Sequence, residues 1–224
     1  MELIRALILD MDGVIIDSNP LHRTAWAEYT RRHGVEMTEA MQQRMYGKRN
    51  DEIVRDFLGA HLDDREVFAH GAAKEALYRE RMRPRVGESL VPGVREFLVR
   101  HRNLHLAVAT NAEAANVDFV LDGAGIRSFF QVVVNGHDVA KPKPYPDIYL
   151  HAAERLNVAP RECIVFEDSH TGVEAGLAAD MRVVGVGATH DDLPGISLLI
   201  RNFNDPALET WLSHFTIQHE PHKK

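Results

Sequence analysis

The stretch that decides the fold is residues 7–18, LILDMDGVIIDS, in which two aspartates interrupt an apolar run. Asp10 and Asp12 are one residue apart, and in an extended chain such residues project to the same side. Two carboxylates that close repel each other, and one is driven toward its neutral form unless a cation lies between them. The alternative is a β-hairpin, because Asp12-Gly13 between apolar segments is a common two-residue turn. A hairpin needs only one aspartate, so the second indicates a further role.

The composition is that of an ordinary globular protein: 224 residues, 45% apolar and 26% charged. The net charge of −7 and the pI near 6.0 argue against nucleic acid or an anionic membrane as a partner, although a local pocket can still bind a small anion. Cys163 is the single cysteine, which excludes a disulfide within the chain and fits a reducing compartment. The N-terminal segment resembles neither a signal peptide nor a membrane span. We therefore expect a cytoplasmic protein, with a monomer as the simplest state.

From residue 90 onward, short apolar segments alternate with helical segments. Strands are expected at 104–110, 132–134, 163–166, 182–186 and 198–200, with helices at 91–101, 113–122, 145–156, 171–179 and 205–214. Short, almost wholly apolar strands between helices indicate a parallel sheet covered on both faces.

An insertion of about seventy residues interrupts this alternation and contains no convincing strand. Helices are expected near 20–33, 38–46, 50–59 and 64–82. The first should begin with Asn19 as N-cap and Pro20 at the first helical position. We therefore predict an α/β protein with a Rossmann-like core, residues 1–16 and 86–224, and an inserted all-helical domain, residues 17–85.

The strands of a parallel sheet end at one edge, where ligands collect. Four segments would bring chemically active side chains to that edge: Asp10 with Asp12, Thr110 with Asn111, Glu167 with Asp168, and Lys141 within KPKPYP. The first segment has the hairpin alternative given above, and each of the other three also has an ordinary alternative. These are a turn before a helix, a polar loop followed by a capping box of Thr171 and Glu174, and a rigid proline-rich turn. Their joint occurrence at one edge is harder to attribute to chance.

The four carboxylates of this set would crowd into one crevice, which a divalent cation makes tolerable. Oxygen ligands in this number suit Mg²⁺. Lys141 adds a positive charge nearby and Thr110 adds a hydroxyl donor. A metal, a lysine, a hydroxyl and backbone N–H groups together form a receptor for a phosphoryl group. The sequence therefore predicts a Mg²⁺-dependent site for a small phosphorylated metabolite.

Taken in order, four segments resemble the motifs of the haloacid dehalogenase superfamily: Asp10-Met11-Asp12-Gly13-Val14, Thr110, Lys141-Pro142 and Glu167-Asp168. The resemblance covers nearly the whole chain. The helical insert directly after the first motif, and Gly172-Val173-Glu174-Ala175-Gly176 after the last, are similar to the β-phosphoglucomutase-like branch. In that branch the insert is a cap that closes over the substrate and excludes water.

The resemblance implies a role for each residue. Asp10 would attack phosphorus and form an aspartyl-phosphate, while Mg²⁺ and Lys141 keep it ionised. Asp12 would protonate the leaving alkoxide and then deprotonate the water or sugar hydroxyl that accepts the phosphoryl group. Thr110 and the Asn111 backbone would bind phosphoryl oxygens. The metal would be held by Asp10, by the Asp12 carbonyl, by Asp168, and by Glu167 either as a ligand or as a partner of bound water.

Two cap segments are also similar to the mutase branch. His22 lies where that branch has a histidine that couples closure to proton transfer, although a helical histidine is also a common packing residue. Tyr46-Gly47-Lys48-Arg49-Asn50 matches the loop that contacts the distal part of the substrate, so we expect Gly47, Lys48 and Arg49 there. The mutase has a lysine in place of Tyr46 and an arginine in place of Asn50, and this departure argues against a bisphosphate intermediate.

Three functions follow as hypotheses. The first is a Mg²⁺-dependent phosphatase acting on a small phosphomonoester such as a sugar phosphate; dehalogenation is not expected, because a halide leaves without the proton that Asp12 would supply. The second is a sugar-phosphate mutase of the β-phosphoglucomutase type. The third is a non-catalytic nucleotide-binding module, but Gly123-Ala124-Gly125 lacks the third glycine of a dinucleotide fingerprint and ends a helix instead of starting one.

Overall fold

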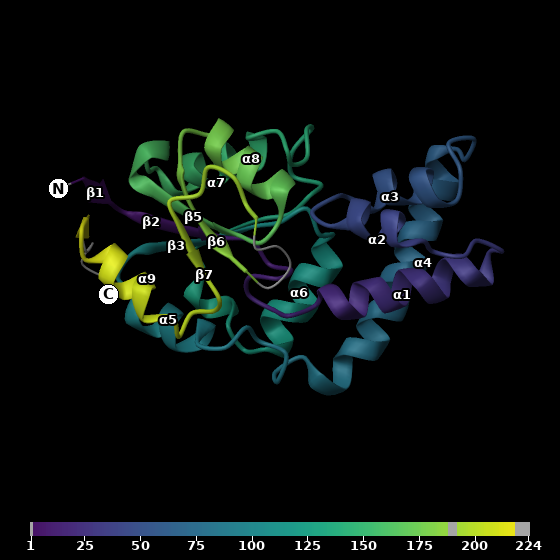
Figure 1. Cartoon of the computed structure of the whole chain (residues 1–224), viewed down its shortest axis with the longest axis horizontal. Helices are drawn as coiled ribbons and strands as arrows, with labels where there is room; N and C mark the ends of the chain where they lie inside the picture. The colour runs from purple at the N-terminus through teal and green to yellow at the C-terminus, as the bar shows by residue number, and fades with distance from the viewer. Residues whose placement is uncertain (1, 188–191, 218–224) are drawn as a thin grey trace.

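A six-stranded parallel sheet forms the centre of the computed structural model, which describes residues 2–187 and 192–217 (Figure 1). In sheet order the strands are β4 (Val132–Val134), β3 (His105–Ala109), β2 (Ala6–Leu9), β5 (Cys163–Glu167), β6 (Arg182–Val186) and β7 (Leu198–Ile200). β2 pairs with β3 on one side and with β5 on the other. A central strand with parallel neighbours on both sides excludes the hairpin alternative for Asp12-Gly13.

Alternate residues of β2 pack on opposite faces of the sheet. Leu7 and Leu9 belong to one apolar cluster, whereas Ala6 and Ile8 belong to another. The first cluster is covered by α5 (Val94–Arg100), α6 (Ala114–Gly123) and α9 (Pro206–Leu212), and the second by α7 (Asp147–Leu156) and α8 (His170–Ala178). Figure 1 shows α7 and α8 above the sheet and α5 and α9 below it. The predicted α/β core with two covered faces is confirmed.

The remaining short elements lie around the sheet. They are the strands β1 (Leu3–Ile4) and β8 (Thr216–Ile217), which pair with each other, and the 3₁₀ turns η1 (Arg83–Arg85), η2 (Arg127–Phe129) and η3 (Pro160–Glu162). β1 and β8 lie at the end of the molecule opposite to the inserted helices (Figure 1). Among the described helices, none combines the length and apolar character that a bilayer crossing requires.

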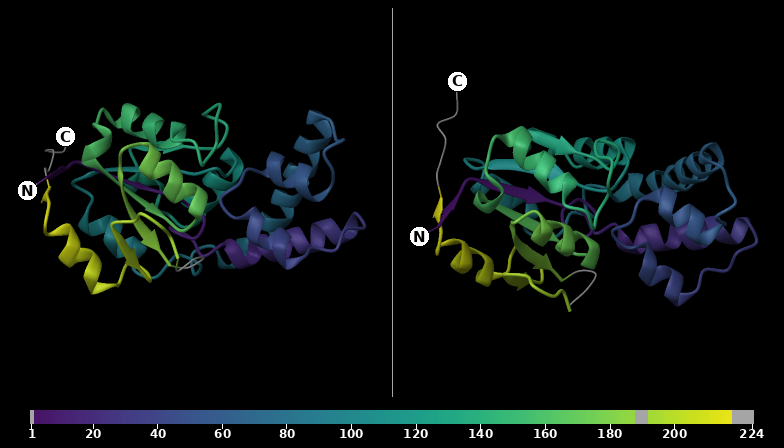
Figure 2. Two further views of the ribbon diagram at one scale, coloured as in Figure 1. Left: turned by 45° about the horizontal axis from the view of Figure 1, so that its top comes forward. Right: turned by 90° about the horizontal axis from the view of Figure 1, so that it is seen from above.

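The insert consists of helices, as predicted. They are α1 (Asn19–Arg32), α2 (Glu39–Met45), α3 (Asn50–Phe57) and α4 (Asp64–Met82), and Figure 2 shows them projecting from one end of the sheet. Their shared apolar cluster includes Trp26, Ile53 and Phe57. α4 begins at a reciprocal cap, in which Asp63 Oδ1 accepts from Glu66 N–H at 2.8 Å and Glu66 Oε2 accepts from Asp63 N–H at 2.9 Å. The domain limits, 1–16 with 86–224 and 17–85, stay a prediction.

Two predicted helix starts need correction. The N-cap of α1 is Ser18, so Asn19 is its first helical residue. The N-cap of α8 is Ser169, whose hydroxyl accepts from Gly172 N–H, so the expected capping box at Thr171 does not begin this helix. In both cases a serine shortly before the expected cap occupies the position, one residue earlier in α1 and two residues earlier in α8.

The two connections to the insert run side by side. Val91 N–H donates to Ile15 O at 3.0 Å, and Asp17 N–H donates to Ser89 O at 2.8 Å. The chain therefore leaves the sheet directly after β2 and returns beside its own exit. This arrangement places the inserted helices at the carboxyl end of β2, where the predicted site lies.

Candidate active site

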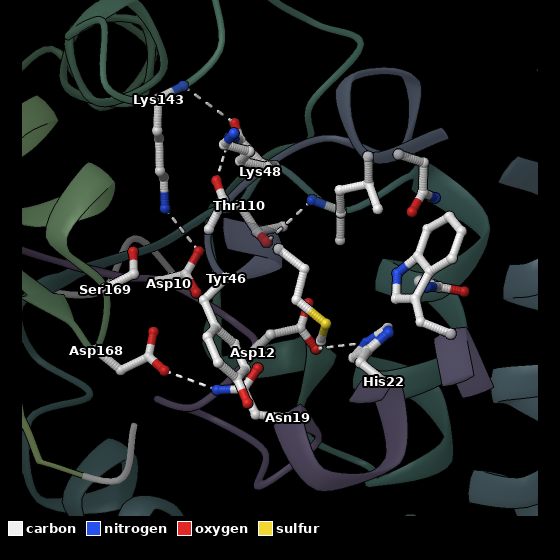
Figure 3. Close-up of a pocket in the computed structure, with 18 of the residues that line it drawn as sticks. Asp10, Asp12, Asn19, His22, Tyr46, Lys48, Thr110, Lys143, Asp168 and Ser169 are labelled. Atoms are coloured by element: carbon white, nitrogen blue, oxygen red, sulfur yellow. Dashed lines mark hydrogen bonds and ion pairs between the residues drawn. The ribbon is translucent and has the colours of Figure 1, made fainter. Parts of the chain in front are cut away.

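Asp10 and Asp12 lie at the junction of the sheet and the inserted helices, and both line one pocket (Figure 3). The Asp10 N–H donates to Phe166 O at 3.0 Å, so pairing with the neighbouring strand fixes the position of this residue. Gly13, just beyond, has φ +83°, and a Cβ added there would lie 1.9 Å from Asp168 Oδ2. Only glycine allows this loop to approach the second acidic strand end so closely.

The two aspartates have different partners. Asp10 Oδ1 accepts from Lys143 Nζ at 2.7 Å. Asp12 Oδ1 accepts from Ser18 Oγ at 2.5 Å and lies 3.3 Å from His22 Nε2. Burial alone raises the pKa of Asp12, but His22 and the Ser18 hydroxyl outweigh this effect and hold the pKa below its ordinary value. Asp12 is therefore ionised and oriented toward the cap side of the pocket.

The structure places Lys143, not the predicted Lys141, beside Asp10. The buried Lys143 ammonium donates to Asp10 Oδ1 at 2.7 Å and to Glu167 Oε1 at 2.6 Å. Lys141 is exposed, and its ammonium lies 5.2 Å from the centre of the Tyr145 ring. Both lysines precede a proline in KPKPYP, so the local sequence does not distinguish them. The way the loop lies against β3 and β5 selects the second.

Glu167 is completely buried, and both of its oxygens accept hydrogen bonds. Oε1 accepts from Lys143 Nζ and from the Tyr149 hydroxyl, each at 2.6 Å. Oε2 accepts from the Asp168 N–H at 2.9 Å, and from the Ser169 N–H at 3.2 Å and hydroxyl at 3.1 Å. Glu167 therefore holds Lys143 in place and anchors the start of α8 to the sheet.

Three carboxylates converge closely enough to share a divalent cation. Among the described residues, Asp10, Glu167 and Asp168 offer oxygens that lie within 4.8 Å of one another. Burial raises the pKa of Asp10 to about 7; Lys143 opposes the rise, and the charges of Glu167 and Asp12 add to it. A cation would stabilise carboxylates that are this poorly solvated, and an all-oxygen set suits Mg²⁺. The residues present therefore fit this metal.

Thr110 and Asn111 follow β3 and line the same pocket. Thr110 is buried, and its hydroxyl oxygen accepts from the Ala112 N–H at 3.2 Å. The Asn111 amide donates to Gly47 O at 2.8 Å, while its carbonyl accepts from the Lys143 N–H at 3.3 Å. The Asn111 side chain thus ties the cap loop to the lysine loop. Phosphate binding by Thr110 and by the Asn111 backbone stays a prediction.

His22 belongs to a buried group on the opposite side of the pocket from Lys143 (Figure 3). Its ring stacks on Tyr78 with centroids 3.8 Å apart, and its Nδ1 lies 2.8 Å from Lys74 Nζ. Lys74 Nζ also donates to Glu75 Oε1 at 2.7 Å. His22 therefore connects Asp12 to a buried ion pair in α4.

This ion pair makes stability pH-dependent. Burial alone would raise the pKa of Glu75, but Lys74, His22 and Asn116 outweigh it and lower the pKa from 4.5 to about 2. A lowered pKa contributes stability that is complete above pH 4.5 and is lost as the pH falls toward 2. Glu75→Gln should reduce the free energy of unfolding by about 3 kcal/mol at neutral pH.

Denaturant unfolding of wild type and Glu75→Gln between neutral and acidic pH measures this difference. We expect the difference in the free energy of unfolding between the two proteins to decrease progressively below pH 4.5, the ordinary pKa of the glutamate side chain. A gap that stays constant down to pH 3 would contradict the assigned charge of Glu75.

The residues of the predicted substrate loop, 47–49, do not all line the same pocket. Gly47 and Lys48 line the pocket, whereas Arg49 borders a neighbouring groove and pairs with Asp51 at 3.1 Å. Arg49 therefore does not line the pocket that contains Asp10, and its contact with substrate stays a prediction. α3 starts here: the Arg49 N–H donates to Glu52 Oε2 at 3.1 Å, and the Arg49 side chain is held by Asp51 in the first turn of the helix.

Gly47 permits close contact between the cap loop and the core. Its φ is +72°, and an added Cβ would lie 2.2 Å from Thr171 Oγ1 and 2.7 Å from Ser169 Oγ. Gly47→Ala should lower kcat/KM by roughly tenfold or more, because the loop can no longer lie against α8. Gly34→Ala is the matched control, since Gly34 has φ +78° with no atom within 4 Å of an added Cβ. Equal kinetic losses in the two variants would show that backbone strain alone is responsible.

Several pocket residues were not identified from the sequence. Asn19 Nδ2 donates to Asp168 Oδ2 at 2.8 Å, a contact that no local pattern announces. Lys74 and Glu75 carry no signal either, because a Lys-Glu pair within a helix is typical of an exposed surface. Lys143 did have a signal, namely the second Lys-Pro pair in its loop.

The chain is similar in sequence to known phosphatases of the family that its motifs resemble. A family model described as haloacid dehalogenase-like hydrolase matches residues 4–180. Fructose-1-phosphate phosphatase YqaB of Escherichia coli is 33% identical over 182 residues, which are 80% of this chain and 95% of that protein. Phosphorylated carbohydrates phosphatase of Thermotoga maritima is 36% identical over 189 residues, 81% of this chain and 84% of that protein.

Among solved structures, β-phosphoglucomutase of Clostridium difficile superposes with a TM-score of 0.86 at 25% identity, covering 94% of this chain and 96% of that one. The family expected from the four motifs is therefore confirmed. The chain belongs to the haloacid dehalogenase-like hydrolases and, within them, to the β-phosphoglucomutase-like enzymes.

Proposed function

We propose that this enzyme is a Mg²⁺-dependent phosphatase that hydrolyses a small phosphomonoester, a sugar phosphate, through an aspartyl-phosphate on Asp10. The observation that carries the proposal is the position of Asp10: buried, 2.7 Å from the Lys143 ammonium, in a pocket with Thr110 and Asp12. The names of the Escherichia coli and Thermotoga maritima relatives support a phosphorylated sugar as the substrate.

Two half-reactions use the same two aspartates. In the first, an Asp10 oxygen bonds to phosphorus, the bond to the leaving oxygen breaks, and that oxygen takes from Asp12 the proton that Asp12 accepted from water in the preceding turnover. In the second, Asp12 takes a proton from the water that attacks phosphorus, phosphate leaves, and Asp10 is restored. Ser18 and His22 hold the Asp12 carboxylate in place for both transfers and favour its ionised form, which the second half requires.

Asp10, Asp168 and the backbone carbonyl of Asp12 would hold the metal. When bound, Mg²⁺ offsets negative charge on the transferring phosphoryl group. Lys143 neutralises Asp10 from the other side, so that an anionic substrate can approach an anionic nucleophile. Glu167, with both oxygens engaged, would support the site by fixing Lys143.

The test is a screen of phosphomonoesters against purified protein, with Mg²⁺ present and after chelation, with inorganic phosphate as the readout. We expect at least one sugar monophosphate to be hydrolysed with Mg²⁺ and none after chelation. Release of phosphate that chelation does not change would contradict the metal assignment, and no release from any compound would contradict the phosphatase.

A sugar-phosphate mutase is the second candidate, favoured by the similarity to the Clostridium difficile β-phosphoglucomutase. The two functions share the aspartyl-phosphate and differ in whether water or a sugar hydroxyl accepts the phosphoryl group. Measuring isomer conversion beside phosphate release separates them. Rapid phosphate release without a bisphosphate primer excludes a dedicated mutase. The match to a hydrolase family argues against a non-catalytic nucleotide-binding module.

A further inference from the structure

The end of the pocket farthest from Lys143 is built by buried polar side chains. Figure 3 shows Lys143, Asp10 and Asp168 on one side and His22 on the other. Three further lining residues are linked to His22, Asn116 through Glu75, and are called here the distal cluster: Lys74, Glu75 and Asn116. All three are at most 3% exposed, so the atoms that a substrate would meet there are held in fixed positions.

The charge of Lys74 is already used within the distal cluster. Its ammonium donates to Glu75 Oε1 at 2.7 Å, lies 2.8 Å from His22 Nδ1, and lies 4.8 Å from the centre of the Trp26 ring. An ammonium has three donors, and these three directions account for them. A negative group on a substrate would have to compete with the Glu75 carboxylate for this lysine.

Glu75 cannot turn away to make room for such a group. Its second oxygen accepts from Asn116 Nδ2 at 2.6 Å. Asn116 is in turn held by Arg79 Nη1, which donates to its side-chain oxygen at 2.6 Å and to Glu113 Oε1 at 2.6 Å. Since Asn116 and Glu113 belong to the core and Glu75 and Arg79 to α4, this chain of contacts fixes the carboxylate across the cap–core junction.

The charge balance of the whole pocket also disfavours a second anionic group on the substrate. Among the described lining residues there are five carboxylates and three lysines, so one divalent cation brings the pocket to neutrality. The reacting phosphate of a monoester then adds the negative charge that the nucleophile side is built to receive. A second phosphate or a carboxylate beside the distal cluster would face Glu75, and the neighbouring Lys74 is already paired with that carboxylate.

We infer that Glu75 determines specificity by confining the site to phosphomonoesters whose leaving group is uncharged and hydroxyl-rich, and by excluding substrates with a second anionic group. The inference rests on the proposed phosphatase function. Within the distal cluster, the Glu75 carboxylate keeps unused lone pairs and the Asn116 amide keeps a second hydrogen, and these can pair with sugar hydroxyls. A site whose buried polar groups suit hydroxyls rejects a ligand that leaves them unpaired or repels them.

The experiment compares fructose 1-phosphate with fructose 1,6-bisphosphate, and glucose 1-phosphate with glucose 1,6-bisphosphate, at saturating Mg²⁺. We expect kcat/KM for the monophosphate to exceed that for the bisphosphate by about tenfold or more in the better pair. Glu75→Gln should raise the ratio of bisphosphate to monophosphate kcat/KM by about tenfold or more. Glu80→Gln is the matched control: the same charge is removed from an exposed position of the same helix outside this pocket, and the ratio should not move.

Calorimetry with the Asp10→Asn protein and the same compounds measures the relative affinity for monophosphate and bisphosphate in the absence of turnover. Equal affinity for mono- and bisphosphate, or a ratio that Glu75→Gln leaves unchanged, overturns the inference even where phosphate is released. A retained preference for the monophosphate in binding, together with absent turnover in wild type, supports the inference and overturns the phosphatase. If Glu75→Gln does not fold, the wild-type comparison is used: a preference for monophosphate over bisphosphate supports the inference, and equal kcat/KM overturns it.

Discussion

Replacing Asp10 by asparagine is expected to lower kcat roughly 10⁴-fold or more, because an amide does not form the acyl phosphate on which both half-reactions depend. The stability of the folded protein should not decrease. Burial raises the pKa of Asp10 to about 7, which means that the surroundings oppose its charge, and a neutral amide of the same size removes that cost. Lys143 keeps Glu167 as its partner at 2.6 Å. Asp10→Asn should therefore unfold at the same temperature as wild type or higher.

Asp17→Asn is the matched control for this experiment. Asp17 lies in the same connection and is exposed, and only its backbone N–H, which donates to Ser89 O at 2.8 Å, is needed there. Steady-state phosphate release and thermal unfolding of the three proteins measure the effect. If Asp10→Asn retained more than about a hundredth of the wild-type kcat, the nucleophile would have to be sought elsewhere.

Replacing Lys143 by methionine should cost both activity and stability. The change leaves Asp10 and Glu167 buried without their shared cation, and breaking a buried pair by removing one partner costs roughly 3–5 kcal/mol. We expect kcat/KM to fall about 10³-fold, because the nucleophile loses the charge that orients it and offsets the substrate's own charge. Mg²⁺ titrations of the variant should show that added metal does not restore the rate.

Lys141→Met provides the comparison, because the two lysines stand in the same sequence setting. Lys141 is exposed and contacts the Tyr145 ring, so its loss should change kcat/KM by less than about twofold and stability by less than about 0.5 kcal/mol. A large loss of activity in Lys141→Met together with a small loss in Lys143→Met would return the role to the first lysine of the loop.

The fold could be predicted because its signals are local and repeated. The central strands β2 and β5 are buried on both faces, so each reads as a short apolar run. The insert reads as helices because its caps are explicit, as at Asp63 and Glu66. The misplaced helix starts show the limit of local reasoning. Asn19 is a good N-cap in isolation, but in the structure its side chain donates to Asp168, 149 residues away. No local pattern contains that contact.

The candidate site was predictable to the extent that strand ends converge. The structure brings Asp10, Asp12, Thr110 and the acidic pair at the end of β5 to one pocket, as expected for the carboxyl edge of a parallel sheet. Choosing between two Lys-Pro pairs required the three-dimensional path of the loop. The buried pair of Lys74 and Glu75 could not be predicted, because its burial depends on α4 lying against the core helix that carries Asn116.

In the proposed reaction the phosphoryl group passes through Asp10, and every other role assigned to the pocket depends on this transfer. The direct measurement is to mix the enzyme with a hydrolysed sugar monophosphate and Mg²⁺, quench in acid within milliseconds, and locate the added phosphoryl group by peptide mass spectrometry. We predict a single acid-stable modification on the peptide that contains Asp10, absent from Asp10→Asn and from the chelated enzyme. A phosphoryl group on another residue, or full turnover with no phosphorylated peptide under conditions that trap a known aspartyl-phosphate, would contradict the account.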